Sequence, residues 1–376
     1  MKIALVHDQL QEFGGAERVL VALKKIFPEA DVFTSFYNLK TLGVHAQNFT
    51  GWKIYTSWVD KIPFLKKLYS PLRFITPLIW ESFDFSNYNL VISSSGSYMS
   101  KGIISPKKTV HICYLHHPPR YLYNYETAIE WQKYLLIKIY GNIINHSLRQ
   151  WDYLSSQRPN YFIANSKETK RRIAKFYRRD AVVIYPPVSI PKISSFSPNN
   201  KYPITNNYYL TVSRLARAKH VDIIIRAANK MKFHLKIIGT GRDEAYLKSI
   251  AGSTVEFLGS VSDEKKNNIY QNAKAFLFAS VDEEFGIAPV EAMGYGLPVI
   301  AYDSGGIPET VKDGLNGFLF NELNADSLIK KVNELISLPK DKCFEMKKQA
   351  RKTAKQFSEE KFKSRFLDLV KRTMSL

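Results

Sequence analysis

Two carboxylates in the last third of the chain, Glu283 and Glu291, are separated by seven residues and flank the segment 286–289. The apolar run 275–279 before them has the length and composition of a buried parallel strand. Gly286 allows close approach of the backbone to a ligand, and Pro289 suits the first turn of a helix. Because a helix start exposes amide N–H groups, Gly286, Ile287 and Ala288 are expected to bind an anion between the two acids. A ligand with a diphosphate and hydroxyl groups, such as a nucleotide sugar, matches this arrangement. The alternative is that both acids are ordinary helix-start residues favoured by the helix dipole.

A second candidate group lies in the segment 213–220, which follows a predicted strand at 208–212. Arg214 and Lys219 are five positions apart, across a loop and the start of a helix, so both can converge on one diphosphate. Arg217 is an additional cation. The alternative is a solvated basic loop, since the chain contains 54 lysines and arginines.

The stretch 282–306 resembles the E-x7-E signature of glycosyltransferase family 4, retaining enzymes with the two-domain GT-B architecture. Glu283, Glu291 and the following segment 294–299 (Gly-Tyr-Gly-Leu-Pro-Val) carry the resemblance. It implies that Arg214 and Lys219 neutralise the departing nucleotide diphosphate, that Glu283 holds the hydroxyls of the donor sugar, and that Glu291 binds the ribose. With His116, discussed next, Glu283, Arg214 and Lys219 form the expected catalytic set.

The N-terminal half contributes two candidate segments. Gly14 and Gly15 follow the first predicted strand, where the family has a glycine-rich donor-binding loop, although a plain tight turn also explains them. His116 follows a predicted strand at 110–115, and strand ends of this kind face the ligand crevice. The segment 116–121 resembles the His-x-Pro-x-Arg-Tyr segment of bacterial family 4 mannosyltransferases, which implies acceptor binding by Arg120 and Tyr121. A structural histidine is the alternative for His116, and the role of His117 is open.

Strands and helices alternate through both halves, which predicts an α/β fold with doubly wound parallel sheets. Together with the resemblance, this predicts a GT-B protein with two Rossmann-like domains facing a central cleft. The acceptor-binding domain is expected over 1–188 and the nucleotide-sugar domain over 208–356. The segment 189–207 has the Pro, Ser and Asn content of a linker. The resemblance further implies that a last helix, 357–376, crosses back to the N-terminal domain.

Composition limits the possible settings of the protein. Two distant cysteines indicate a reducing cytoplasm and no zinc site, and the sequence contains neither a signal peptide nor an apolar run of membrane-spanning length. The net charge of +20 predicts attraction to polyanions. The stretch Trp58–Trp80 mixes cations with aromatic residues, which suits an anionic membrane surface, although a solvated face is the alternative.

The combined expectation is a hexosyltransferase that moves mannose from GDP-mannose onto a lipid-diphosphate-linked oligosaccharide. It would be peripheral on the inner face of the cytoplasmic membrane, in lipopolysaccharide O-antigen or exopolysaccharide assembly. No Asp-x-Asp metal motif occurs, so a reaction without metal or other cofactor is expected. A UDP-sugar donor is the alternative. A nucleic-acid-binding protein would explain the charge, but the sequence contains no recognition module for it. A non-catalytic membrane adaptor would leave Glu283 and Glu291 without a role.

Overall fold

The computed structural model describes residues 1–62, 65, 68–127, 134–191 and 208–374. The chain forms two compact units, which are described separately. The first consists of residues 1–125, 130–187 and 359–376, and the second of residues 126–129 and 188–358. Most of the expected linker, from residue 192 to 207, lies outside the described residues.

The first unit is built on a parallel sheet with the strand order β3-β2-β1-β4-β5-β6-β7. The order reverses between β1 and β4, and sheets of this type bind ligands beyond the carboxyl ends of the strands at that point. His7 ends β1 and is in register with Ser94 of β4. The strands are β1 (Ile3–His7), β2 (Asp31–Thr34), β3 (Ile54–Thr56), β4 (Leu90–Ser95), β5 (Val110–Leu115), β6 (Tyr161–Ala164) and β7 (Val182–Val183).

Both faces of this sheet are buried. Ala4 and Val6 of β1 belong to an apolar cluster that includes Trp80, whereas Leu5 belongs to a second cluster with Leu20. Because side chains alternate between the faces of a strand, β1 is apolar at every position over 3–6, as in central strands of parallel sheets. The helices of this unit are α1 (Gly15–Ile26), α2 (Leu39–Leu42), η1 (Gly43–Phe49), η2 (Trp58–Lys61), η3 (Arg73–Ile75), α4 (Thr76–Glu81), η4 (Ser100–Gly102), η5 (Arg120–Leu122), α5 (Leu135–Ser155), α6 (Lys167–Tyr177) and α14 (Glu359–Met374).

The second unit contains a second parallel sheet, with the order β10-β9-β8-β11-β12-β13. Its order reverses between β8 and β11, so the loops after these two strands border the expected ligand position. The strands are β8 (Tyr208–Val212), β9 (His234–Ile238), β10 (Val255–Gly259), β11 (Phe276–Phe278), β12 (Val299–Tyr302) and β13 (Gly317–Phe320).

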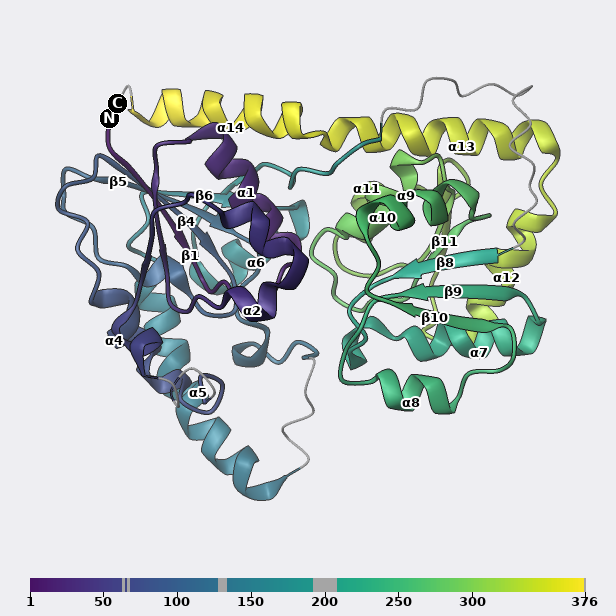
Figure 1. Cartoon of the computed structure of the whole chain (residues 1–376), viewed down its shortest axis with the longest axis horizontal. Coiled ribbons are helices and arrows are strands. Elements are labelled where there is room, and N and C mark those ends of the chain that lie inside the picture. Colours follow the sequence, from purple (N-terminus) through teal and green to yellow (C-terminus); the bar gives the residue numbers. More distant parts are fainter. Residues whose placement is uncertain (63–64, 66–67, 128–133, 192–207, 375–376) are drawn as a thin grey trace. The chain divides into compact units, whose positions relative to one another are not determined.

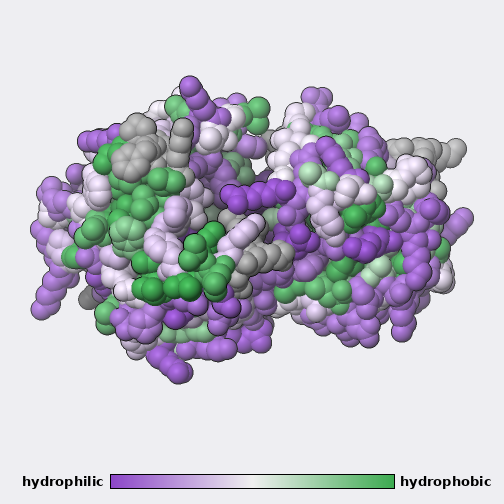
Figure 2. All heavy atoms as spheres, turned by 90° about the horizontal axis from the view of Figure 1, so that it is seen from below, coloured by the Kyte–Doolittle hydropathy of each residue, from purple (hydrophilic) through white to green (hydrophobic). Residues whose placement is uncertain are grey.

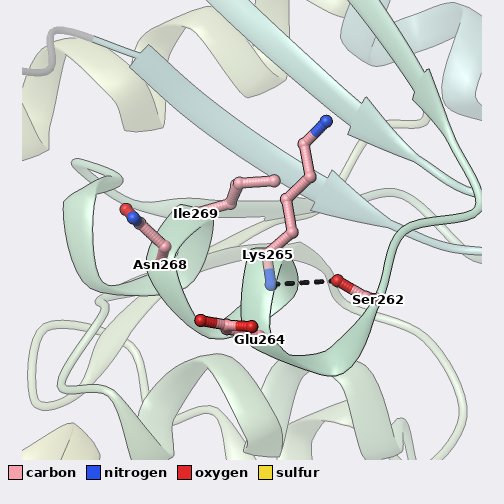
Figure 3. A pocket seen from close by; sticks show the side chains of 5 residues that line it. All are labelled: Ser262, Glu264, Lys265, Asn268 and Ile269. Carbon is pink, nitrogen blue, oxygen red and sulfur yellow. Dashed lines mark hydrogen bonds between the residues drawn. The ribbon is translucent and has the colours of Figure 1, made fainter.

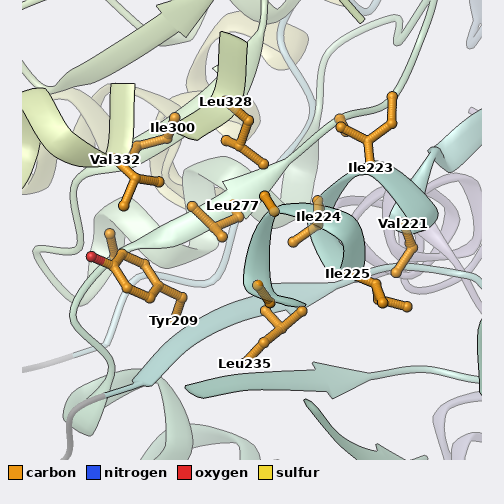
Figure 4. Close-up of a cluster of buried hydrophobic side chains, with 14 of the residues drawn as sticks. Tyr209, Val221, Ile223, Ile224, Ile225, Leu235, Leu277, Ile300, Leu328 and Val332 are labelled. Atoms are coloured by element: carbon orange, nitrogen blue, oxygen red, sulfur yellow. The ribbon is translucent and has the colours of Figure 1, made fainter. Parts of the chain in front are cut away.

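The core of the second unit lies between the sheet and the helices α7 and α12. Ile224 of α7, Leu277 of β11 and Val332 of α12 meet there (Figure 4). The two parallel sheets confirm the predicted α/β, Rossmann-like fold class. The helices of this unit are η7 (Arg217–Lys219), α7 (Val221–Met231), α8 (Glu244–Ser249), α9 (Asp263–Asn272), α10 (Ile287–Gly294), α11 (Ile307–Thr310), α12 (Ala325–Ile336), α13 (Lys340–Ala354) and η8 (Lys355–Phe357).

The last helix, α14, packs on the first unit, where it runs beside α1 (Figure 1). The ring of Phe366 is fully buried and lies 6.2 Å from that of Phe27, and Phe362 lies 6.0 Å from Tyr114. Full burial of one such side chain contributes about 1.5–3 kcal/mol. The apolar face of α14 therefore attaches this helix to the rest of the first unit.

A buried ion pair anchors the C-terminal half of α5 in the first unit. Lys101 and Asp152 form a salt bridge, and both side chains are completely buried. The Lys101 ammonium also donates to Ser155 Oγ at 3.3 Å, and the Tyr123 hydroxyl donates to the second oxygen of Asp152 at 2.7 Å. These hydrogen bonds compensate for the loss of hydration that burial of charge imposes.

Candidate active site

Two of the residues that the sequence singled out in the second unit, Lys219 and Glu283, come together before the start of α10. Lys219 Nζ lies 2.5 Å from Glu283 Oε2, and Ser280 Oγ donates to the same oxygen at 2.7 Å. Lys219 also lies 3.3 Å from Ser280 Oγ. Ser280 is the second residue after β11, Glu283 lies in the loop before α10, and Lys219 lies in the segment after β8. The cluster therefore joins the carboxyl ends of the two strands at which the sheet order reverses.

The loop around Glu283 is held in an unusual backbone conformation. Asp282 and Gly286 have φ angles of +52° and +81°. Behind the loop, Gly306 N donates to the carbonyl of Glu283 at 2.7 Å. A Cβ on Gly305 would lie 2.2 Å from that same carbonyl oxygen. Because Gly305 and Gly306 have no side chains, their backbone can lie directly against the backbone of the loop that contains Glu283.

Glu291 lies in the second turn of α10, and its carboxylate is fixed by the neighbouring helix α9. It is only 6% exposed, and Lys266 Nζ lies 3.0 Å from its Oε2. The Tyr270 hydroxyl is 3.5 Å from the same oxygen, and the Tyr270 ring stacks on Tyr295 at 4.9 Å. Each of the two signature acids therefore has its own lysine.

Arg214 is exposed in the loop after β8, which packs on the loop after β9. Gly239 has a φ of +135°, and a Cβ there would lie 1.9 Å from the carbonyl oxygen of Ser213. A Cβ on Gly241 would lie 2.1 Å from the carbonyl oxygen of Leu215. These two glycines allow the β9 loop to fix the backbone on either side of Arg214.

The third cation of this loop, Arg217, is directed to a different partner. Its Nε lies 3.5 Å from Asp243 Oδ2, and its guanidinium lies 4.9 Å from the centre of the Tyr246 ring. Arg217 therefore has a local structural role, which agrees with its having no position in the family pattern.

In the first unit, His116 is one end of a buried chain of hydrogen bonds. Its Nε2 lies 2.8 Å from Ser94 Oγ, and the same oxygen lies 3.0 Å from His7 Nδ1. His7 Nε2 lies 3.3 Å from Glu17 Oε1, and the other oxygen of Glu17 accepts from Gly14 N at 2.7 Å. All four side chains are at least nine-tenths buried.

The glycine loop differs from its expected use in one respect. Gly14 is the N-cap of α1 with an extended φ of −141°, a conformation open to any residue, and its amide is bound by the carboxylate of Glu17. The amide of Gly14 is therefore already engaged within the protein. Gly15 is the exposed first residue of α1.

A second buried acid, Asp8, fixes the loop after β4. Its carboxylate accepts hydrogen bonds from the backbone amides of Gly96, Tyr98 and Ser100 at 2.7–2.9 Å. A Cβ added to Gly96 would lie 3.4 Å from the Nε2 of His117. Asp8 thus holds together the ends of β1 and β4 next to His117.

Arg120 and Tyr121, the residues expected to bind the acceptor, lie in η5. Arg120 is half-buried. The ring of Tyr121 is only 9% exposed, its hydroxyl donates to the carbonyl of Ser97, and the guanidinium of Arg73 lies 4.1 Å above it. Burial raises the pKa of the Tyr121 hydroxyl. Tyr121 therefore packs in the interior, and Arg73 stacks on it instead of standing free as a surface cation.

Comparison with known proteins agrees with the fold. The structure of Anabaena Alr3699/HepE in complex with UDP and glucose superimposes with a TM-score of 0.71 over 99% of both chains, at 21% identity. The architecture is GT-B. Residues 194–356 of this GT-B chain match the family model of the glycosyl transferases group 1.

Two sequence relatives extend the comparison of the GT-B chain. An uncharacterized glycosyltransferase, MJ1178 of Methanocaldococcus jannaschii, is 31% identical over 52% of this chain and 54% of its own. The alpha-1,3/1,6-mannosyltransferase alg2 of Schizosaccharomyces pombe is 26% identical over 85% of this chain and 70% of its own. The chain spans about half the length of several curated relatives that it matches.

Several residues that contact the candidate site residues were not identified from the sequence. Ser280 lies just beyond the end of β11, and that position was the available signal for it. Lys266 and Tyr270 share a helix face at i, i+4 spacing, but lysines are too frequent in this chain for the spacing to stand out. His7 ends the first strand, as His116 follows a later one, and the same strand-end argument identifies it.

The outer surface of α9 contains an open hollow that does not include the acidic cluster. It is lined by Ser262, Glu264, Lys265, Asn268 and Ile269 (Figure 3). Ser262 Oγ accepts from the amide of Lys265 at 3.3 Å, so Ser262 is the N-cap of α9.

Proposed function

We propose that this protein is a retaining glycosyltransferase that moves mannose from GDP-mannose to a lipid-diphosphate-linked oligosaccharide. The observation that carries the proposal is the contact of Lys219, Ser280 and Glu283 at the start of α10. The match of residues 194–356 to the glycosyl transferases group 1 supports the reaction class. The GT-B architecture supports nucleotide-sugar binding.

The proposed reaction relies on fixed charge in the protein. Lys219, Arg214 and the first amides of α10, at Ile287 and Ala288, stabilise the negative charge that develops on the departing diphosphate. Glu283 holds the hydroxyls of the donor sugar. These cations and amides supply positive charge where the leaving group forms, so the proposal requires no bound metal ion or other cofactor.

Glu291 is assigned to the ribose of the donor. Its carboxylate is held in one orientation by Lys266 and lies one to two turns into α10, beyond the amides at the helix start. A ribose diol hydrogen-bonds well to a carboxylate oriented in this way. For Gly14 and Gly15 of the first unit, donor binding stays a prediction.

Two relatives point to different donors. The S. pombe relative is an alpha-1,3/1,6-mannosyltransferase, which supports a mannosyl donor. The Anabaena structure contains UDP and glucose, which keeps a UDP-sugar as the second candidate. His116, at the segment that resembles bacterial mannosyltransferases, favours the first.

A thermal-shift series tests the donor directly. GDP-mannose at about 100 times its Kd is expected to stabilise the nucleotide-binding unit by about 2.7 kcal/mol and to raise its Tm. UDP-glucose and UDP-galactose at equal concentration are expected to leave Tm unchanged. A shift with a UDP-sugar alone would replace the donor, and the absence of a shift with any nucleotide sugar would contradict the proposal.

The acceptor is proposed to lie at an anionic membrane surface on the cytoplasmic side, within O-antigen or exopolysaccharide assembly. Support comes from the first half of α5, where Leu136 is 81% exposed. Figure 2 shows apolar side chains gathered on this side of the first unit. Among the described helices, none has the length and apolar character required to cross a bilayer. The exposed apolar residues, here called the α5 patch, are Tyr134, Leu135, Leu136, Ile137, Ile139, Tyr140 and Ile143. The Tyr140 hydroxyl donates to the carbonyl of Pro71, and two further exposed apolar residues, Phe74 and Leu78, follow Pro71 in the sequence.

The α5 patch is a different candidate for the membrane-facing surface from the stretch Trp58–Trp80 that the sequence suggested. Within Trp58–Trp80, Trp58 is exposed but Trp80 is fully buried and donates to the carbonyl of Tyr98. The lysines at 66 and 67 lie outside the described residues. Trp80 belongs to the core because it fills the space between α4 and the sheet.

Vesicle sedimentation tests the α5 patch. Wild-type protein is expected to bind vesicles of phosphatidylglycerol more tightly than vesicles of phosphatidylcholine, since each lysine or arginine near an anionic surface contributes about 1 kcal/mol. The double variant Leu135→Asp/Leu136→Asp is expected to lose most of this binding. The matched control is Ile336→Asp, an exposed apolar residue of α12. Equal loss in the control, or dimerisation through the patch detected by light scattering, would contradict membrane docking.

A further inference from the structure

The buried chain Glu17–His7–Ser94–His116 has a definite hydrogen-bond polarity. An ionised carboxylate only accepts hydrogen bonds, so the His7 nitrogen that faces Glu17, Nε2, carries the proton. In neutral His7 the other nitrogen, Nδ1, is then an acceptor, and the Ser94 hydroxyl donates a hydrogen bond to it. The Ser94 oxygen is left to accept from Nε2 of His116.

From this polarity we infer that Glu17 and His7 are positioning residues that set the tautomer of His116 through Ser94. The proton of neutral His116 is held on Nε2, and Nδ1 is the nitrogen with the lone pair. The inference rests on the proposed function only for its catalytic consequence, namely that the tautomer of His116 affects sugar transfer. The hydrogen-bond chain itself is independent of the substrate.

The same contacts link His116 to the glycine loop. Glu17 binds His7 with one oxygen and the amide of Gly14 with the other, at 2.7 Å. Glu17 therefore couples the start of α1 to the histidine that follows β5. His7 and His116 also lie close, with ring centres 6.5 Å apart.

The substitution Glu17→Gln gives a sharp test. A carboxylate accepts from both Gly14 and His7, whereas the side-chain amide of glutamine has only one acceptor oxygen. The amide N–H of Gly14 selects the carbonyl oxygen of the glutamine, so the NH₂ group faces His7 Nε2 and donates to it. Each donor in the chain is then reversed: His7 Nδ1–H donates to Ser94, and Ser94 donates to His116 Nε2. The proton of His116 moves to Nδ1, three hydrogen bonds away from the substitution.

The measurement is ¹⁵N NMR of histidine-labelled full-length protein at a mildly alkaline pH, where an ordinary imidazole is neutral. In the wild type, His116 is expected to show a protonated, pyrrole-like Nε2, and in Glu17→Gln a protonated Nδ1. Ser94→Ala is expected to give a mixture of both tautomers. Signals are assigned with a His116→Gln variant. An unchanged Nε2–H tautomer in Glu17→Gln would overturn the inference.

Ser93→Ala is the matched control. Ser93 is the neighbour of Ser94 in β4, is equally buried, and lies 2.8 Å from the Nε2 of another buried histidine, His111. The control is expected to leave the His116 tautomer as in the wild type, and a tautomer change in it would overturn the inference.

Transfer assays separate this inference from the proposed function. Ser94→Ala and Glu17→Gln are expected to lower kcat about 10–100-fold, part of the contribution of a positioned acid–base group, with a smaller effect on the KM for the donor. A reversed tautomer together with an unchanged kcat would support the hydrogen-bond chain and overturn the catalytic role of His116.

Discussion

Replacing Lys219 with methionine is expected to lower kcat for sugar transfer by about 10²–10³-fold, the effect of removing one group that stabilises transition-state charge. Lys219 is the cation held against Glu283 and Ser280. It lies at the carboxyl ends of β8 and β11, where the sheet order reverses. A diphosphate leaving group at the start of α10 would develop its charge within reach of this ammonium.

The fold of the Lys219→Met variant is expected to be preserved. The side chains of Lys219 and Glu283 are 21% and 16% exposed, so water can solvate the carboxylate that loses its partner. Lys219→Arg keeps the charge and is expected to recover part of kcat. The readouts are steady-state transfer with radiolabelled donor and the Tm of each variant.

Arg217→Met is the control for Lys219→Met. Arg217 comes from the same loop but pairs with Asp243 and packs on Tyr246. It is expected to change kcat less than about threefold, because Arg217 has its own partners away from Glu283 and its ion pair is partly exposed to solvent. Equal losses in the two variants would show that the effect comes from the loop conformation and not from the charge at Glu283.

The parallel sheets could be predicted because their central strands are apolar at consecutive positions. The runs at 3–6, 90–92 and 275–279 have no polar face, which occurs when both sides of a strand are covered. β3 and β13 were not predicted. The three residues of β3 are all at least partly exposed at the sheet edge, and β13 is a four-residue segment that begins with a glycine. Neither provides a long enough apolar run.

The candidate site could be predicted where its chemistry lies in one local string. Glu283, Gly286 and Glu291 lie in one short segment of the sequence. Because the carboxyl ends of parallel strands share one edge of a sheet, Lys219, which comes after β8, is expected near Glu283, which comes after β11. Contacts between distant segments could not be predicted. Lys266 meets Glu291 only because α9 packs beside α10, and His7 meets Ser94 only because β1 and β4 are paired in register. The order of residues along the chain predicts neither the packing of α9 on α10 nor the pairing of β1 with β4.

The prediction with the largest expected effect on stability concerns Lys101, whose apolar stem and buried ammonium offer no sequence signal. Lys101→Met leaves Asp152 fully buried without its cation, which is expected to lower the free energy of unfolding of the first unit by about 3–5 kcal/mol. The measurement is urea denaturation followed by circular dichroism. Lys230→Met, whose partner Asp326 is 72% exposed, is the control and is expected to change stability by less than about 1 kcal/mol.

A second variant distinguishes lost attraction from a stranded charge. Lys101→Met/Asp152→Asn removes both charges while the asparagine carbonyl still accepts from Tyr123, and it is expected to recover much of the lost stability. The Lys101–Asp152 pair holds the C-terminal half of α5 against the first unit, whereas the first half of α5 is exposed and carries the α5 patch. Lys101→Met is therefore also expected to weaken vesicle binding, and the double variant to restore it in parallel with stability. A loss of stability no larger than that of Lys230→Met would contradict the anchoring role of the pair.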